Sequence, residues 1–341
     1  MVDNKKKDIY FFYSKLYFMQ FTNELEILNS VLEKSSSIVQ KGLEKRLSEE
    51  ETTKVLAIML FEITNNLKDR LIEVRDYEQI AKVGAFKYAG RADAMFKEGL
   101  MPEDVYKELK EIMPEDTRHI GPVYLRVKGL LTHIPTRIFF GRQMAFTFRD
   151  YLEQNPLSKP EGFIVCAPNM TGGAWIGDET SRQLQSVLTK HRVWPATPYF
   201  REARKPIDVK SPGAKLVDYV EGLIPSPQST SCIFCFEELR TAAETTSNAT
   251  KIYRSFGYND ENKVRIAEAC VFDYGHPVGV ERLRRLSTDR LYLVDGKTFL
   301  RVSRELGYIT NSQYQTGTDW LNNPWEFTKK VLPDVKRLVG K

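Results

Sequence analysis

The sequence has few residues of the kinds that mark secreted, zinc-binding or membrane proteins. Only four of its 341 residues are cysteine and four are histidine. Cys232 and Cys235 form a single Cys-x-x-Cys pair, with no second pair and no histidine at the spacing of a zinc site. On one strand these two side chains would face opposite sides. We therefore interpret all four cysteines, including Cys166 and Cys270, as core thiols in a reducing compartment.

Long apolar runs and a strong charge imbalance are also lacking. No run reaches the ~18 residues that a membrane helix needs. The start, Lys5–Lys7 followed by 9–21, is similar to a signal peptide, but Lys15 interrupts it and no cleavage site of small residues follows. The 50 basic and 45 acidic residues leave a net charge of +5, which suits a small anionic ligand better than nucleic acid. We expect a cytoplasmic protein that binds neither membranes nor nucleic acid.

The length and composition predict two domains with a sizeable core. In the first third, apolar residues recur at helical spacing around positions 27–32 and 56–71. Ser48 and three following acids are typical of a capped helix start, and a further helix is predicted over Pro102–Ile112. The aromatic cluster at 10–18 could form a membrane or partner surface, but we favour packing against its own domain.

After Gly121, short apolar runs alternate with helical stretches, which predicts βαβ units and a parallel sheet. The runs expected as strands are Ile138–Phe140, Phe163–Ala167, Ser231–Phe236 and Ala267–Phe272. We divide the chain into a helical domain (1–118), an α/β domain (119–310) and a tail (311–341). The tail is expected to pack on the core as a loop and a short helix from Pro324.

Residues 233–245 give the strongest indication of a ligand site. The apolar run Ile233–Phe236 is typical of a strand buried on both faces of a parallel sheet. Glu237 and Glu238 end this run, and open α/β sheets bind ligands beyond that end of their strands. The small residues that follow suit a turn into a helix whose free amides hold a phosphate. The segment indicates a phosphorylated sugar, although similar segments occur in α/β proteins that bind nothing there.

Two other segments have the composition of anion sites. After the strand Phe163–Ala167, the glycines of Thr171-Gly172-Gly173 allow close backbone approach and supply amide groups. Arg201 and Lys205 lead into a stretch with proline and glycine. That stretch is either a mobile lid that brings cations over an anionic leaving group or a solvated surface loop.

In this order the segments resemble a type I phosphoribosyltransferase over roughly residues 120–310, with a layout most similar to the orotate phosphoribosyltransferase-like branch. The most specific part is the family's thirteen-residue motif for phosphoribosyl pyrophosphate (PRPP). In order, it consists of four apolar residues, two acids, two variable positions and Thr. A small residue, a position that is usually Gly, a position open to any residue and a final Thr complete it. Residues 233–245 fit it. The resemblance implies an α/β fold with a Rossmann-like parallel sheet, here preceded by an N-terminal α-helical domain.

The resemblance also implies a role for each segment. The acids Glu237 and Glu238 would hold the ribose hydroxyls and assist Mg²⁺ indirectly. The turn around the 5-phosphate would be Thr241, Ala242, Ala243, Glu244 and Thr245. The pyrophosphate loop would be Thr171, Gly172 and Gly173. The flexible catalytic loop would begin with Arg201 and Lys205 and close at Glu221-Gly222. The residues that flank the acceptor base would be Asp273 and Tyr274.

The implied reaction is PRPP-dependent pentosyl transfer. Pyrophosphate leaves C1 of the ribose, an oxocarbenium-like centre develops, and a nucleobase nitrogen attacks. The protein would position the reactants and neutralise pyrophosphate charge with Mg²⁺, backbone amides and mobile cations. No covalent nucleophile is required, and we interpret the histidines at 119, 133, 191 and 276 as structural. Members of this fold often pair, so a homodimer is expected.

Several positions depart from the family pattern. Ala243 stands where glycine is usual, and Glu244 adds a carboxylate beside the phosphate turn. Glu202 replaces a lysine after Arg201, and Ile207 occupies the place of a loop histidine. Tyr274 stands in place of the arginine that pairs with a substrate carboxylate, and 128–130 lacks the Ser-Gly-Lys of orotate enzymes. Orotate is therefore not the expected acceptor.

Three hypotheses remain open. The first is an enzyme that transfers phosphoribosyl to an unidentified base-like acceptor. The second is a PRPP-sensing regulator that keeps the ligand site without turnover. The third is a structural partner protein on a vestigial fold.

Overall fold

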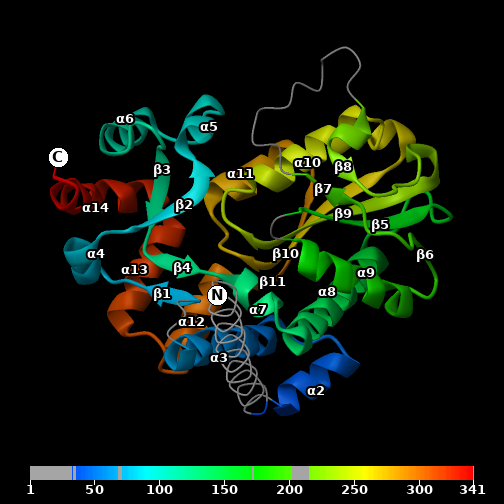
Figure 1. Ribbon diagram of the computed structural model, residues 1–341, viewed down its shortest axis with the longest axis horizontal. Helices are drawn as coiled ribbons and strands as arrows, with labels where there is room; N and C mark the ends of the chain where they lie inside the picture. Colours follow the sequence, from blue (N-terminus) through cyan, green and yellow to red (C-terminus); the bar gives the residue numbers. More distant parts are fainter. Residues whose placement is uncertain (1–32, 34–35, 68–70, 171–172, 202–214, 341) are drawn as a thin grey trace, which may run out of the picture.

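A five-stranded, wholly parallel sheet forms the centre of the α/β region. The computed structural model describes residues 33, 36–67, 71–170, 173–201 and 215–340 (Figure 1). The strand order is β11-β10-β9-β5-β6. These strands are β5 (Phe163–Pro168), β6 (Arg192–Val193), β9 (Thr230–Arg240), β10 (Arg265–Asp273) and β11 (Asp289–Asp295). A parallel sheet with flanking helices confirms the expected fold class.

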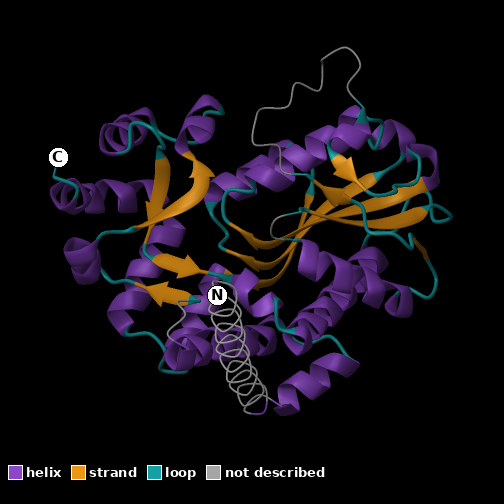
Figure 2. Cartoon of the chain, in the orientation of Figure 1, coloured by secondary structure: helices purple, strands orange, loops and turns teal. Residues whose placement is uncertain are grey.

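Helices cover both faces of this sheet (Figure 2). The lower face in that view is covered by α8 (Ile134–Gln154) and α9 (Ala174–Val187), and the upper face by α10 (Glu244–Ser255) and α11 (Pro277–Arg285). Successive residues of β9 enter two separate cores: Cys232, Phe234 and Phe236 face one, Ile233 and Cys235 the other. This double burial is why the strand is an uninterrupted apolar run.

The four cysteines are free and buried, as expected for core thiols. Cys232 and Cys235 belong to different cores and so face opposite sides of β9, as the strand alternation predicts. Burial raises the pKa of Cys232 to about 12.

The N-terminal region is mainly helical. Its helices are α2 (Ser36–Glu44), α3 (Glu49–Leu67), α4 (Tyr77–Val83), α5 (Ala92–Lys97), α6 (Glu103–Ile112) and α7 (Val127–Leu131). The predicted helix starts are confirmed. Ser48 Oγ accepts a hydrogen bond from the Glu51 amide at 3.2 Å, and α6 covers the range predicted from Pro102.

Two short antiparallel ribbons in this region were missed by the sequence reasoning. They pair β1 (Ile72–Val74) with β4 (Val123–Leu125) and β2 (Phe86–Arg91) with β3 (Arg118–Gly121). Each strand is too short for its alternation to stand out against helical periodicity. The ribbons tie residues 118–125 to the earlier part of the chain. The division at 118/119 stays a prediction.

The tail is entirely helical in its described part. After α12 (Gly296–Glu305) come α13 (Asn311–Asn322) and α14 (Pro324–Leu338). The helix predicted from Pro324 is confirmed, but the loop predicted before it is wrong. The Thr310 hydroxyl accepts from the Gln313 amide at 3.1 Å, and the Gln313 side chain accepts from the Thr310 amide at 2.9 Å. This capping box starts α13.

The strand predicted over Ile138–Phe140 is also wrong, because this run lies inside α8. A run of three apolar residues does not distinguish a strand from one side of a buried helix. In α8 the buried residues recur at helical spacing, including Phe140, Met144 and Phe148. The Phe148 ring stacks on Phe234 of β9 with centroids 3.6 Å apart.

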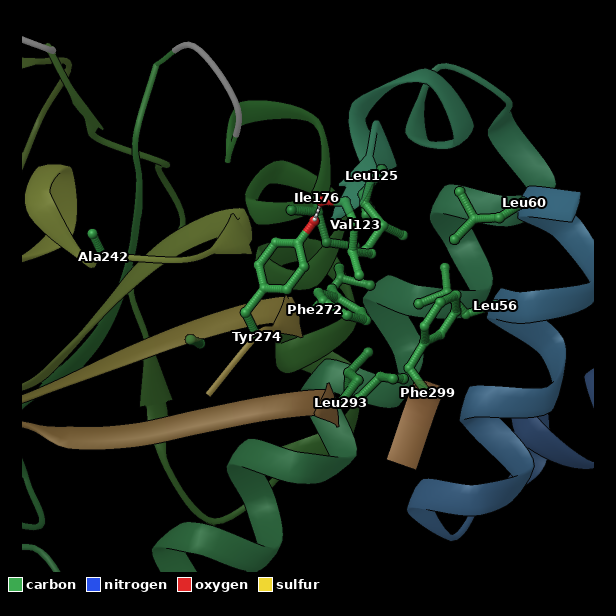
Figure 3. Close-up of a cluster of buried hydrophobic side chains, with 14 of the residues drawn as sticks. Leu56, Leu60, Val123, Leu125, Ile176, Ala242, Phe272, Tyr274, Leu293 and Phe299 are labelled. Atoms are coloured by element: carbon green, nitrogen blue, oxygen red, sulfur yellow. Dashed lines mark hydrogen bonds between the residues drawn. The ribbon is translucent and has the colours of Figure 1, made fainter. Parts of the chain in front are cut away.

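One hydrophobic cluster joins the N-terminal helices, the sheet and the tail. Figure 3 shows its part between Leu56, Phe272 and Phe299. Leu56 of α3, Phe272 of β10 and Phe299 of α12 all belong to it. Tyr274 donates a hydrogen bond to the carbonyl of Val123 at 3.4 Å. The N-terminal region is therefore fixed directly against the strand ends of the α/β region.

Candidate functional site

The chain reverses its direction of progress across the sheet between β5 and β9. From β5 it moves outward to β6, then returns to place β9 on the other side of β5 and continues to β10 and β11. Open α/β sheets bind ligands beyond the carboxyl ends of the strands at such a switch point. The residues to consider are those that follow Pro168 in β5 and Phe236 in β9, which are register partners.

Asn169 and Glu237 meet at this point. The Asn169 side chain donates a hydrogen bond to Glu237 Oε1 at 3.1 Å, and its backbone amide donates to the Phe236 carbonyl at 2.9 Å. Asn169 is 1% exposed, and its Oδ1 has no hydrogen-bond partner in the described part of the chain. A buried amide oxygen without a partner is costly, so it is available to a ligand hydroxyl. Sequence reasoning missed Asn169, although it is the first side chain after a buried strand that can both donate and accept hydrogen bonds.

Glu237 and Glu238 occupy successive positions of β9, so their side chains leave the strand on opposite faces. Glu237 shares its face with Cys235 and with Glu268 of β10, the register partner of Cys235. Burial raises the pKa of the Glu237 carboxyl well above its ordinary value, and the charges of Glu238 and Glu268 add to this, while a hydrogen bond with Thr245 acts in the opposite direction. Compared with a carboxyl in water, the protonated form of Glu237 is therefore stabilised.

Glu268 of β10 lies on the same face of the sheet as Glu237. It is fully buried, and its Oε1 accepts a hydrogen bond from the Thr250 hydroxyl of α10 at 2.9 Å. Burial raises the pKa of this carboxyl to about 7, although the positive charge of Arg240 and hydrogen bonds with Thr246 and Thr250 oppose the rise. Sequence reasoning missed Glu268, because it is a single acid within an otherwise apolar strand.

The turn 241–243 leads from β9 into α10. Ala243 is the N-cap residue of α10 and has φ 52° and ψ 31°, the left-handed conformation. An alanine there costs on the order of 1 kcal/mol relative to glycine. The N-cap side chain is a methyl group and makes no hydrogen bond to the first amides of α10. Uncapped amides at a helix start are the groups that bind phosphate in many α/β proteins.

Glu244, the first residue of α10, forms an ion pair with an arginine of the N-terminal region. Its Oε1 lies 3.2 Å from a guanidinium nitrogen of Arg91, at the end of β2. The Arg91 backbone amide also donates to Glu244 Oε2 at 3.3 Å. The carboxylate that the sequence placed beside a phosphate site is therefore neutralised by the N-terminal region.

Asp273 and Tyr274 lie at the end of β10 with only 2% of each residue exposed. Asp273 Oδ2 accepts from Arg240 Nε at 2.8 Å and also from Arg290, and Oδ1 accepts from the Gly275 amide at 2.8 Å. Despite burial, these two arginines hold the pKa of Asp273 below its ordinary value. Both side chains are thus engaged by the protein itself.

Gly173 has a structural reason to be glycine. A Cβ atom there would lie 2.2 Å from the Phe236 carbonyl oxygen, because the start of α9 packs against the backbone of β9. The other two residues of the predicted pyrophosphate loop, Thr171 and Gly172, lie outside the described residues.

Arg201 follows β7 (Tyr199–Phe200), which pairs with β8 (Val220–Glu221). Its guanidinium lies 3.3 Å from a Glu221 carboxylate oxygen, and both side chains are about half exposed. The two predicted ends of the catalytic loop are thus side by side. Lys205, Glu202 and Ile207 lie outside the described residues.

Short 3₁₀ helices occur at Leu216–Asp218, Pro227–Ser229 and Asp260–Asn262. We interpret the four histidines as structural. His276 is fully buried and its Nδ1 accepts from the Val278 amide at 3.3 Å at the start of α11, which is a structural role.

A cavity of about 270 Å³ lies elsewhere, beside the edge strand β11 and the start of α3. Its lining includes Arg46, Glu49, Gln143 and Arg290 and contains no residue of the predicted site. Within the described residues, every helix is too short or too polar to span a bilayer. The same residues contain no group of three His, Cys, Asp or Glu side chains that could hold a metal ion.

No protein-family model and no curated protein sequence matches this chain. Matching solved structures include UMP synthase of Leishmania donovani, with 15% identity over 64% of this chain and 42% of its own, and a TM-score of 0.41. Orotate phosphoribosyltransferase from Aeropyrum pernix is 18% identical over 64% of this chain and 99% of its own, with a TM-score of 0.37. Adenine phosphoribosyltransferase from Trypanosoma brucei is 13% identical over 58% and 83%, with a TM-score of 0.35.

The match spans less than half of the UMP synthase. These structures are of the kind that residues 233–245 resemble, so the resemblance stated from the sequence is found again among solved structures. The function proposed below is argued from this chain's own residues.

Proposed function

We propose that this protein is a phosphoribosyltransferase that transfers phosphoribosyl from Mg-PRPP to a nucleobase-like acceptor other than orotate and releases pyrophosphate. One observation carries the proposal. At the switch point of the sheet, Asn169 after β5 contacts Glu237 in the last part of β9, the strand that leads into the left-handed start of α10. Hydroxyl-binding groups beside free helix amides suit a sugar phosphate.

Each part of the ligand has a proposed place. Glu237, Glu238 and Asn169 bind the ribose hydroxyls, and the turn 241–245 binds the 5-phosphate. The segment 171–173 binds pyrophosphate, with Arg201 and Lys205 brought over it by the loop between β7 and β8. Asp273 and Tyr274 shape the acceptor side of the crevice and, being buried, offer it no open charge.

In the proposed reaction the bond between C1 and the pyrophosphate oxygen breaks, and the electron pair leaves with pyrophosphate. A base nitrogen donates its lone pair to C1, and the ring nitrogen loses its proton to solvent. Bound magnesium supplies charge neutralisation on the pyrophosphate. Its contacts with Glu237 and Glu238 would be indirect, since the two acids face opposite sides of β9. The protein contributes position and a fixed polar environment.

The environment of Tyr274 supports the exclusion of orotate. A carboxylate substrate needs a cation partner at this end of β10. The Tyr274 hydroxyl instead donates to the Val123 carbonyl, and its ring packs on Trp320 with centroids 5.3 Å apart. Saturable, orotate-dependent consumption of PRPP by the purified protein would contradict this.

The test is calorimetric titration with Mg-PRPP, followed by pyrophosphate release across a panel of bases. Glu237→Ala should weaken PRPP binding by about tenfold or more, the equivalent of one or two hydrogen bonds. Glu261→Ala, an exposed acid away from the site, is the matched control. Unchanged PRPP affinity in both Glu237→Ala and Glu238→Ala would contradict the site assignment. If the natural protein does not bind PRPP, the proposed function is wrong.

A PRPP-sensing regulator without turnover is the second candidate. The environment of Glu237 favours it, because the raised pKa makes this carboxyl less charged, and a less charged carboxyl still binds hydroxyls but stabilises a developing cation less. Binding of PRPP with no pyrophosphate release from any base would support this candidate. We also propose that the protein works as a cytoplasmic homodimer, which light scattering on the purified protein would check for the oligomeric state.

A further inference from the structure

The N-terminal region reaches the phosphate turn through one ion pair. Arg91 and Glu244 contact each other through three hydrogen bonds, one from the Arg91 amide and two from its guanidinium, at 3.2–3.4 Å. The Glu244 side chain is 21% exposed, whereas Arg91 is 51% exposed. The Arg91 guanidinium therefore contacts the side chain of the first residue of α10. Because Arg91 is half exposed, part of the guanidinium is open to a ligand.

Two arginines face each other where β2 ends and β3 begins. Arg91 is directly opposite Arg118 in this antiparallel ribbon. Like charges in such positions destabilise a ribbon unless anions offset them. Asp116 lies 2.7 Å from Arg118, and Glu244 offsets Arg91. The ribbon thus presents basic side chains at its end beside α10.

A third guanidinium holds the turn itself. Arg282 of α11 is 4% exposed; its Nη1 donates to the Ala242 carbonyl at 2.7 Å and its Nε to Glu98, just after α5, at 2.7 Å. Its Nη2 has no hydrogen-bond partner among the residues that the structure describes. The fork is directed at the turn, and one buried donor there lacks an acceptor. Figure 1 shows α5 and the end of β2 beside α11.

We propose that the N-terminal region completes the phosphate site, with Arg91 as the cation that binds the ligand's phosphate group and Glu244 as the residue that positions it. The ligand class is a sugar 5-phosphate, an identification that rests on the proposed function. A phosphate dianion beside Glu244 alone would be repelled. With Arg91 in place the same carboxylate orients a planar fork that suits phosphate oxygens.

A purely structural ion pair predicts a different result. An exposed pair contributes little to stability, so Arg91→Ala would then change neither folding nor binding noticeably. If Arg91 binds phosphate, its removal leaves stability nearly constant and weakens phosphate binding. Affinity and stability, measured on the same variants, separate the two.

The experiment titrates ribose 5-phosphate and Mg-PRPP into the full-length protein and four variants by calorimetry. We expect Arg91→Ala to weaken ribose 5-phosphate binding about tenfold or more and Arg91→Lys to recover part of it. Glu244→Gln added to Arg91→Ala should recover several-fold of the loss, because the unopposed carboxylate is gone. Arg301→Ala, which removes a comparable exposed ion pair with Glu50 and Glu305, is the control and should bind as the natural protein does.

The outcomes distinguish this inference from the proposed function. Normal binding by Arg91→Ala together with pyrophosphate release overturns the inference and leaves the function. Binding that depends on Arg91, without release from any base, supports the inference and counts against the transferase. No binding of either phosphate by the natural protein overturns both.

Discussion

Replacing the buried Glu268 by glutamine should make the protein less sensitive to rising pH. Glu268 is fully buried on β10, where burial is the main cause that raises its pKa to about 7. In the unfolded chain its pKa is near the ordinary 4.5. The folded state therefore holds the proton more tightly, and the stability that this group contributes is fully present below pH 4.5. It is lost as the pH rises towards 7.

The size of the effect follows from the shift. A rise from 4.5 to about 7 corresponds to on the order of 3 kcal/mol in the free energy of unfolding. Between pH 5 and pH 8 the natural protein should lose about 2–3 kcal/mol through this group. Glutamine keeps the shape and can still accept from the Thr250 hydroxyl, but it does not titrate. Glu268→Gln should lose correspondingly less over the same interval.

Urea unfolding at pH 5 and pH 8, extrapolated linearly to water, measures the difference. The comparison between protein and variant cancels other groups that titrate in this range, such as Glu49, whose pKa is raised to about 7. Glu153→Gln, at a side chain that is 69% exposed, is the control and should follow the natural protein. If Glu268→Gln loses stability in parallel with the natural protein, Glu268 does not titrate as described.

Three further predictions concern packing, buried charge and thiols. Gly173→Ala should destabilise the unliganded protein by about 2 kcal/mol or more in urea unfolding, because the alanine Cβ would clash with the Phe236 carbonyl. Normal stability with lost PRPP affinity would show instead that the glycine is needed for ligand binding. Arg240→Met should cost about 3–5 kcal/mol, because Asp273 would stay buried with one partner fewer; thermal unfolding checks it, and a melting temperature unchanged from the natural protein would contradict it. A thiol reagent at pH 8 should modify none of the four cysteines in the folded protein and all four in denaturant, and rapid labelling of the folded protein would contradict their burial.

The sequence predicted elements correctly where a strong local pattern acts alone. Phe163–Ala167 and Ser231–Phe236 are strands because their residues are apolar on both faces, and α3 starts after Ser48 because its cap is local. It failed where the pattern was short. The run at Ile138–Phe140 is compatible with a helix and a strand alike, and only its neighbours in α8 decide.

The candidate site shows the same division. The acids and the turn could be predicted, since they follow a recognisable strand. Ala243 stands where glycine is usual, and in the structure this residue has the left-handed conformation that glycine adopts most easily. Asn169 and Glu268 could not be predicted as neighbours of Glu237, because a single polar residue after or within a strand carries no periodic signal.

By itself the sequence determined that the fold would contain a parallel sheet. It also predicted that one strand carries an acid pair and leads into a turn with the composition of a phosphate site. Only the tertiary structure decided what surrounds that turn. Arg91 and Glu244 are 153 positions apart, and no local pattern relates them. Their contact exists because one hydrophobic core holds the N-terminal region against the ends of the strands. Periodicity determines which face of an element is buried, whereas the packing of whole layers determines which distant charges meet.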